Sequence, residues 1–446
     1  MPDRRSAFIK STLILLGTLF LFSHSCKTTD PENGLNGHFS LEQLRADFTQ
    51  MRNALESNHP DRLRYETAET LSGLFDAAHA TLRDGMTEGE FYRVVAPLVA
   101  RTHCGHTNIR PSDGFSSALG NSARVLPLGI YLDNGKAYVD ADYGSQSGIA
   151  LGSEVLAING EALPGVVERL LAGISADALN TSAKIHRLNR NFHLYYYYFW
   201  GDVPRFDLRV KEAHGGAEFL VQVNARAYSQ VSRDAGSRFP WSGRLALEIN
   251  GSLAVLTVPT FVIGQNPDYR AFFADAFQRL NNGGVKRLII DIRGNGGGDP
   301  DLSACLIAHL IDKPFIYFKK GQGYDYLFAE TAPHAVHFQG KTLVLIDGGC
   351  FSTSGHFCSL VRHHALAEFV GETGGGTFRC HDNSREFVLS HSGMRLRVAR
   401  TTYEAAVPDH DVSAGFPPDF RVYPGIQNIL SGTDAQMDFA VRKLEE

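Results

Sequence analysis

Short apolar runs alternate with helical patterns in the second half of the chain, from about residue 237 onward. Largely apolar runs occupy 253–258, 287–292 and 342–346, each the length of a buried strand. Apolar positions recur at three- and four-residue spacing in 269–280 and 302–311, which predicts helices. Alternating strands and helices predict parallel βαβ units with a site at the carboxyl ends of the strands. We therefore expect an α/β domain over 235–430 and a C-terminal helix over 431–446.

The first half shows two other patterns. Residues 39–118 carry apolar positions at helical spacing and predict an N-terminal helical bundle. Residues 128–139 form two alternating runs around Asn134-Gly135, a strong hairpin signal. Residues 148–161 resemble the core of a PDZ domain, so 124–225 are expected to form a PDZ-like β-rich insert that engages an extended peptide at a sheet edge.

The extreme N-terminus has the pattern of a processing signal. Basic residues precede an apolar core over 12–22, and Ser23-His-Ser-Cys26 follows directly. This order resembles a bacterial lipoprotein signal, which predicts a signal peptide over 1–25, a lipidated Cys26 and a tether over 26–38. The alternative is an ordinary cleaved signal with an incidental cysteine. Either way we expect an exported protein, and the lipid anchor would make it a periplasmic or cell-surface lipoprotein of a bacterium.

Composition narrows the function. The 446 residues are 43% hydrophobic with a net charge of −5, which suits a multidomain globular protein without a polycationic face. Nucleic acid is therefore not an expected partner. The remaining cysteines show no zinc-binding spacing, so we predict no metal site and no cofactor. These are Cys104, Cys305, Cys350, Cys358 and Cys380.

A candidate nucleophile lies in the stretch 341–361. The apolar run ends at Asp347-Gly-Gly, and helical spacing begins at about Ser354, which predicts strand, tight turn and helix. Ser352 would lie in the turn, beside the free N–H groups at the start of the helix. Because serine is also a preferred N-cap, this placement alone does not establish a nucleophile.

Two further segments carry candidate chemistry. His103 and His106 flank a glycine at the end of the helical region, where a histidine could serve as a general base if Ser352 folds against it. As a metal site the pair lacks a nearby carboxylate, although one could arrive from elsewhere in the chain. The glycine-rich loop 294–300 lacks the Lys-Ser/Thr ending of a phosphate-binding loop, and its backbone N–H groups suit an oxyanion instead.

Four segments, in order, resemble the signatures of the C-terminal-processing (tail-specific) serine protease family: 289–298, 349–354, 370–376 and 415–422. The resemblance implies a ClpP/crotonase-like α/β core that hydrolyses peptide bonds, with a peptide or protein substrate. The chain has no Lys between Lys341 and Lys443, which excludes the family's Ser-Lys dyad in this segment. The form of 370–376 resembles instead the tricorn-core and interphotoreceptor-retinoid-binding-protein-like branch.

The resemblance implies roles for particular residues. Ser352 matches the nucleophile, with Ser354 as runner-up, and the N–H groups of Thr353 and of Gly297 or Gly298 match the oxyanion hole. His106 matches the branch's base, with Cys104 where the branch has Asp. An acid that orients the histidine is expected at Asp411 or Asp409, of which Asp411 is chosen. The alternative function is a catalytically inactive homologue that binds a peptide or an apolar ligand.

Overall fold

The computed structural model describes residues 34–237, 243–411 and 413–446. The predicted signal peptide, the tether up to residue 33 and Cys26 lie outside the described residues. Within the described part of the chain, no helix is long and apolar enough to cross a membrane.

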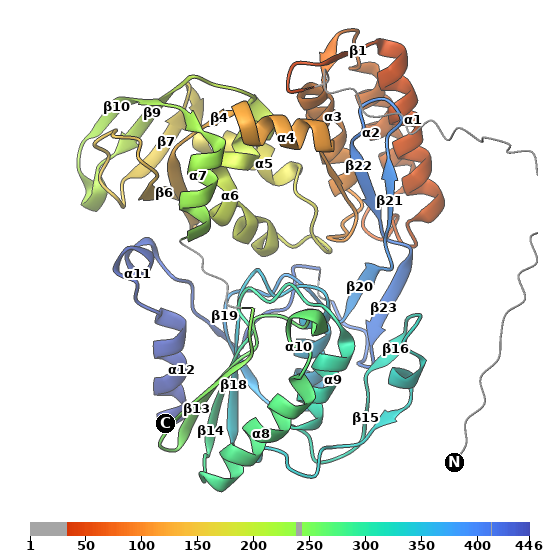
Figure 1. Ribbon diagram of the computed structural model, residues 1–446, viewed down its shortest axis with the longest axis vertical. Helices are drawn as coiled ribbons and strands as arrows, with labels where there is room; N and C mark the ends of the chain where they lie inside the picture. The colour runs from red at the N-terminus through yellow and green to blue at the C-terminus, as the bar shows by residue number, and fades with distance from the viewer. Residues whose placement is uncertain (1–33, 238–242, 412) are drawn as a thin grey trace, which may run out of the picture.

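A six-stranded sheet forms the centre of the lower part of the molecule (Figure 1). Four neighbouring strands run parallel, β24 continues the parallel order at one edge, and β12 pairs antiparallel with β13 at the other. In spatial order the strands are β12 (Ala246–Asn250), β13 (Leu253–Thr257), β14 (Arg287–Asp291), β18 (Lys341–Ile346), β19 (Glu368–Gly371) and β24 (Phe420–Arg421). The α/β prediction is therefore confirmed for this region, and β13, β14 and β18 match the three apolar runs.

Helices cover both faces of this sheet (Figure 1). One face packs on α8 (Tyr269–Asn282), α9 (Pro300–Ala308) and α10 (Thr353–His363). The other face packs on α12 (Ala435–Glu445), whose Ala440 and Leu444 contact the strands. Both faces of β14 and β18 are thus buried, which explains why their sequences are almost continuously apolar.

The upper part combines helices with an antiparallel sheet. The helices are α1 (Leu41–Asn58), α2 (Ala68–Ala80), α3 (Glu88–Ala100), α5 (Leu163–Ala172) and α6 (Ser182–Trp200). The sheet has the order β10 (Glu218–Asn224), β9 (Arg205–Lys211), β7 (Glu154–Ile158), β6 (Lys136–Asp142), β5 (Leu128–Asp133). The predicted hairpin joins β5 to β6, with Asn134 at φ 49° and Gly135 at φ 78°, as a primed turn requires.

The predicted bundle and the β-rich insert share one hydrophobic core. That core joins Phe48 of α1 and Val95 of α3 to Ile130 of β5 and Leu208 of β9. It also includes Leu396 from a strand far along the chain, β22 (Arg395–Val398), which pairs with β3 (Asn108–Arg110). The sequence patterns indicated separate modules because local periodicity carries no information about which faces meet.

Buried Asp47 anchors this long-range contact. Its carboxylate accepts hydrogen bonds from the N–H of His391 at 2.9 Å and from the N–H and hydroxyl of Ser392 at 2.7 and 2.6 Å. Asp47 is 1% exposed, so removing the carboxylate leaves buried donors without a partner.

We predict that Asp47→Ala lowers the free energy of unfolding by about 3 kcal/mol, because several buried hydrogen bonds are lost together. Arg45→Ala, on an exposed position of the same helix, is the control and should change it by less than about 0.5 kcal/mol. Chemical denaturation of both variants measures the difference. Equal effects would show that the Asp47 contact does not stabilise the fold.

Candidate active site

Ser352 lies in a sharp turn between β18 and α10, at the carboxyl edge of the large sheet. Its backbone has φ 58° and ψ −123°, a conformation that costs a non-glycine residue about 1–3 kcal/mol. The residue is the N-cap of α10, yet its side chain makes no capping hydrogen bond. The hydroxyl is therefore available for other chemistry, as in the strand–turn–helix elbow that presents a nucleophile.

Ser354, the runner-up nucleophile, has a different environment. It is fully buried, and its hydroxyl donates a hydrogen bond of 2.8 Å to the carbonyl of Asn295. This bond ties the turn to the glycine-rich loop after β14. Ser352, by contrast, lines a cavity.

The glycine-rich loop packs directly against the Ser352 turn. A Cβ at Gly297, where φ is 93°, would lie 2.8 Å from Cβ of Ser352 and 2.9 Å from N of Thr353. The hydroxyl of Thr353 donates to the carbonyl of Gly298 at 2.5 Å and fixes the two segments together. Only glycine permits so close an approach at this φ.

Two backbone N–H groups at this junction are available to an oxyanion. The N–H of Gly297 is not, because it donates to Oδ1 of Asn295 at 2.9 Å. Among the described residues, the N–H groups of Gly298 and Thr353 donate no hydrogen bond. Of the three residues predicted for the oxyanion hole, the geometry favours these two.

His106 lies beside the Ser352 turn and is 7% exposed. Its ring packs on Phe351, the residue before Ser352, with centroids 4.6 Å apart. Gly105 makes this contact possible, because a Cβ there would lie 2.6 Å from the Phe351 ring. Burial lowers the pKa of His106 to about 4, although the nearby Asp382 carboxylate acts to raise it. The imidazole is therefore neutral at pH 7, as a general base must be.

The carboxylate that faces His106 is Asp382, at the end of β20 (Arg379–Asp382), with Oδ2 3.5 Å from Nε2. Burial acts to raise the pKa of Asp382, but His106 together with Ser384 and Arg397 holds it below its usual value. Ser384 and Arg397 donate hydrogen bonds to Oδ1 at 2.8 and 2.9 Å. Asp382 is thus charged and oriented. Sequence reasoning missed it because it lies in a polar segment with no motif around it.

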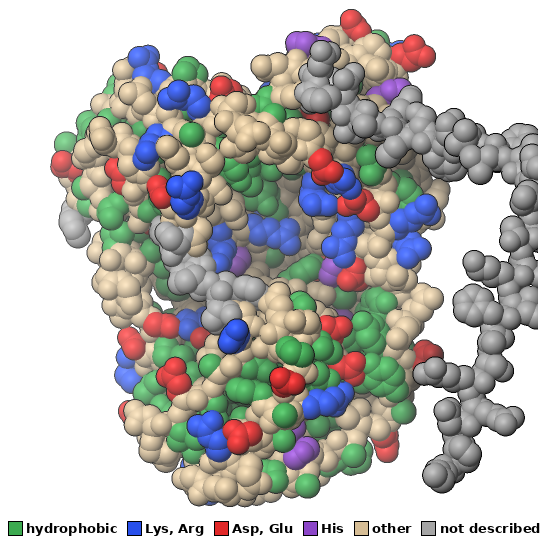
Figure 2. Space-filling model, in the orientation of Figure 1, with side chains coloured by type: hydrophobic (Ala, Val, Ile, Leu, Met, Phe, Trp, Pro, Cys, Tyr) green, Lys and Arg blue, Asp and Glu red, His purple; other side chains and the backbone are tan. Residues whose placement is uncertain are grey.

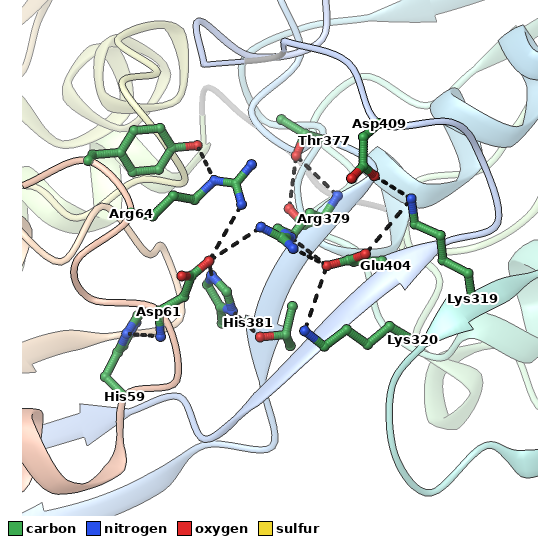
Figure 3. Close-up of polar contacts among 12 residues, drawn as sticks. His59, Asp61, Arg64, Lys319, Lys320, Thr377, Arg379, His381, Glu404 and Asp409 are labelled. Carbon is green, nitrogen blue, oxygen red and sulfur yellow. Dashed lines mark hydrogen bonds and ion pairs between the residues drawn. The ribbon is translucent and has the colours of Figure 1, made fainter.

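The structure does not bring the predicted acids to His106. Asp411 lies on an exposed loop, where its carboxylate accepts the N–H of Ser413 at 2.8 Å. Asp409 pairs with Lys319 (Figure 3). The order of the motifs locates this loop only approximately, whereas the direction of a side chain depends on the register of each residue.

A network of charged side chains around buried Glu404 holds β20 in place (Figure 3). Arg379 on this strand pairs with buried Glu404 of β23 (Thr401–Ala405) and lies 3.4 Å from the Asp61 carboxylate. Asp61 follows α1, and its carboxylate also lies 3.7 Å from Nε2 of His381. The network therefore fixes the strand that ends in Asp382 to both parts of the molecule.

A cavity of about 240 Å³ opens in front of Ser352. Its lining includes Gly298, Thr353 and Asp382 together with His356 and Cys380, which sequence reasoning did not single out. The Cys380 thiol interacts with the Ser352 hydroxyl and lies 3.5 Å from Nε2 of His356. Among the described residues, no hydrogen bond joins Ser352 to His106.

A larger cavity, of about 470 Å³, lies in the upper part and includes Gly105, Arg187 and Tyr195 in its lining. The Arg187 guanidinium also lies 5.9 Å from the ring centroid of Phe351, which links this cavity to the nucleophile turn. Figure 2 shows a deep hollow between the upper and lower parts, with Lys and Arg side chains inside it.

The strained turn at Ser352, the two free amides and the neutral histidine are the kinds of group that a serine-type hydrolase site combines. Residues 252–422 match the model of peptidase family S41, a segment that contains both the glycine-rich loop and Ser352. This segment is an S41 peptidase domain, and the protein is a serine-type peptidase whose substrates are peptides or proteins.

Solved structures share the fold over most of the chain. Mature CPAF is 14% identical, with a TM-score of 0.68 over 91% of this chain and 97% of that one. Mature CPAF complexed with lactacystin is 14% identical, with a TM-score of 0.67 over 91% of this chain and 98% of that one.

We predict that Gly297→Ala reduces the rate of labelling by a fluorophosphonate probe at least about 100-fold, because the new Cβ displaces the Ser352 turn and with it the oxyanion amides. Gly296→Ala is the matched control, since a Cβ there meets nothing within 4 Å. Comparable labelling of the two variants would show that the close approach of the loop is not required.

Proposed function

We propose that this protein is an exported bacterial peptidase in which Ser352 attacks the peptide carbonyl and His106 takes the serine proton. The observation that carries the proposal is the strained Ser352 turn, which opens on a cavity beside two free amides and a buried neutral histidine. The intact nucleophile and oxyanion geometry favour this activity over an inactive homologue that binds a peptide or an apolar ligand.

The reaction follows from these positions. Proton transfer from Ser352 to His106 lets the hydroxyl oxygen bond to the carbonyl carbon, and the N–H groups of Gly298 and Thr353 hold the resulting oxyanion. The imidazolium then protonates the departing amine, which leaves an acyl-enzyme. Water, deprotonated by His106, releases the acid and restores Ser352.

Asp382 supports the charged state of the base. When His106 accepts a proton in its buried position, the Asp382 carboxylate 3.5 Å away stabilises the imidazolium. We therefore assign to Asp382 the electrostatic role that the sequence motifs suggested for Asp411.

The proposal extends to substrate engagement and location. Among the described residues, β10 pairs only with β9, which leaves one edge of the PDZ-like sheet open, and Leu220 on this strand is 79% exposed. An extended peptide could add to that edge as a further strand.

The basic and apolar pattern of residues 1–25 with Cys26 supports export and anchoring by lipid at the periplasmic membrane or cell surface.

Fluorophosphonate labelling tests the central step. We expect the purified protein to be labelled, and Ser352→Ala to abolish labelling because the attacking oxygen is gone. His106→Ala should reduce the rate at least about 100-fold through loss of the base. Ser354→Ala is the control for the serine and should still be labelled. Absence of labelling in the folded protein would favour the inactive binding homologue.

The pH dependence tests the roles of His106 and Asp382. Because burial lowers the pKa of His106 to about 4, we expect the labelling rate to fall on the acid side near pH 4 rather than near the usual value of about 6.5. Asp382→Asn removes the charge that raises this pKa, so the fall in labelling rate on the acid side should move to lower pH. The labelling rate at pH 7 should drop about tenfold or more, because the imidazolium loses its stabilising charge.

Asp411→Asn is the matched control. It should change neither the pH at which the labelling rate falls on the acid side nor the rate at pH 7. Circular dichroism across the same pH range shows whether each variant remains folded. An effect of Asp411→Asn equal to that of Asp382→Asn would return the role to the residue that the motifs suggested.

A further inference from the structure

Three side chains with metal-binding donors, the proposed base among them, meet in the interior of the protein. Cys104, His106 and Asp177 each offer one donor atom, all three residues are buried, and these atoms lie within 4.8 Å of one another. The first two residues flank Gly105, whose N–H donates to Oδ1 of Asp177 at 2.7 Å. This bond holds the carboxylate beside the Cys-Gly-His segment.

Two of the donors have no partner within the described part of the chain. Nδ1 of His106 and Oδ2 of Asp177 are buried without a hydrogen bond, although the residues are only 7% and 4% exposed. A buried polar atom without a hydrogen-bond partner destabilises a fold by about 1–3 kcal/mol, so two of them side by side indicate a missing ligand. Nε2 of His106 already faces Asp382, which leaves Nδ1 as the nitrogen available to a ligand.

Cys104 completes the set with a free thiol. Its Sγ lies 3.8 Å from the carbonyl oxygen of His381, a weak hydrogen bond.

The donor set selects the kind of ion. One thiolate, one imidazole and one carboxylate are typical zinc ligands, whereas Mg²⁺ and Ca²⁺ prefer oxygen ligands only. Bonds of about 2.0–2.3 Å require the donors to move together by about 1 Å at most. A water molecule would take the fourth position of a tetrahedral site.

We propose that Cys104, His106 and Asp177 form a Zn²⁺ site that reversibly blocks the catalytic base, an inference that rests on the proposed function for its effect on catalysis. The thiol releases its proton to solvent when it binds, and the thiolate and carboxylate balance the two positive charges. Coordination at Nδ1 leaves the single proton of the imidazole on Nε2. His106 then cannot accept the proton of Ser352.

Local sequence patterns do not predict this site. Two histidines beside a cysteine lacked a carboxylate in their neighbourhood, and we predicted no metal. The fold supplies the carboxylate from the segment between α5 and α6.

Metal binding is measured first, because it does not depend on activity. The purified protein, freed of metal by a chelator, is titrated with Co²⁺, whose thiolate complexes absorb in the near ultraviolet. We expect one such Co²⁺ per chain, displaced by Zn²⁺, and loss of the absorption in Cys104→Ser and Cys104→Ala. Cys305→Ser removes a more accessible thiol and should keep it.

Fluorophosphonate labelling with and without Zn²⁺ then measures the effect on the base. We expect Zn²⁺ to slow labelling at least tenfold in the unaltered protein and in Cys305→Ser, with recovery after chelation. In both Cys104 variants the labelling rates with and without Zn²⁺ should be nearly equal. Melting temperatures show whether these variants are folded.

The outcomes separate the two proposals. No thiolate absorption in the unaltered protein overturns the metal site, whether or not the protein is labelled. Metal binding in a protein that is never labelled leaves the site standing and overturns the proposed activity. Zinc sensitivity that survives in a folded Cys104 variant shows that the ion acts elsewhere and overturns the inference.

Discussion

The backbone of Ser352 depends on hydrogen bonds that its neighbours make to the glycine-rich loop. The N–H of Phe351 and the hydroxyl of Ser354 both donate to the carbonyl of Asn295, at 3.0 and 2.8 Å. Thr353 reaches the same loop through Gly298. Because residues on both sides of Ser352 are tied to a neighbouring strand's loop, the turn cannot relax without breaking several contacts, and its strained φ is maintained.

Because His106 is buried, its protonated state needs a stabilising charge nearby. The Phe351 ring and the surrounding protein exclude water from His106, which keeps the imidazole neutral but makes its protonated state costly. A fixed carboxylate offsets that cost, and Asp382 is fixed by Ser384 and Arg397. In the proposed mechanism the charged network around Glu404 would act on catalysis only indirectly, since it holds the strand that carries Asp382.

The features that could be predicted from the sequence are those with a local cause. β14 and β18 are apolar because both faces are buried, and the Asn134-Gly135 turn and the elbow at Ser352 follow from residues next to each other in the chain. Asp382 could not be found this way, because its contact with His106 depends on the pairing of β20 with β23. The same reason explains the choice of Asp411, where order along the chain was known but side-chain direction was not.

Because no hydrogen bond joins Ser352 to His106 within the described part of the chain, the proposed mechanism requires one of the two groups to move. His106 is held on one side by the Phe351 ring, which fits only because residue 105 is glycine, and on the other by Asp382. The Ser352 hydroxyl is attached to a fixed backbone by a single rotatable bond and interacts with the Cys380 thiol at the cavity wall. Rotation about that bond costs far less than repacking a buried ring, so in the proposed mechanism the hydroxyl is the group that turns toward His106 when a carbonyl enters the cavity.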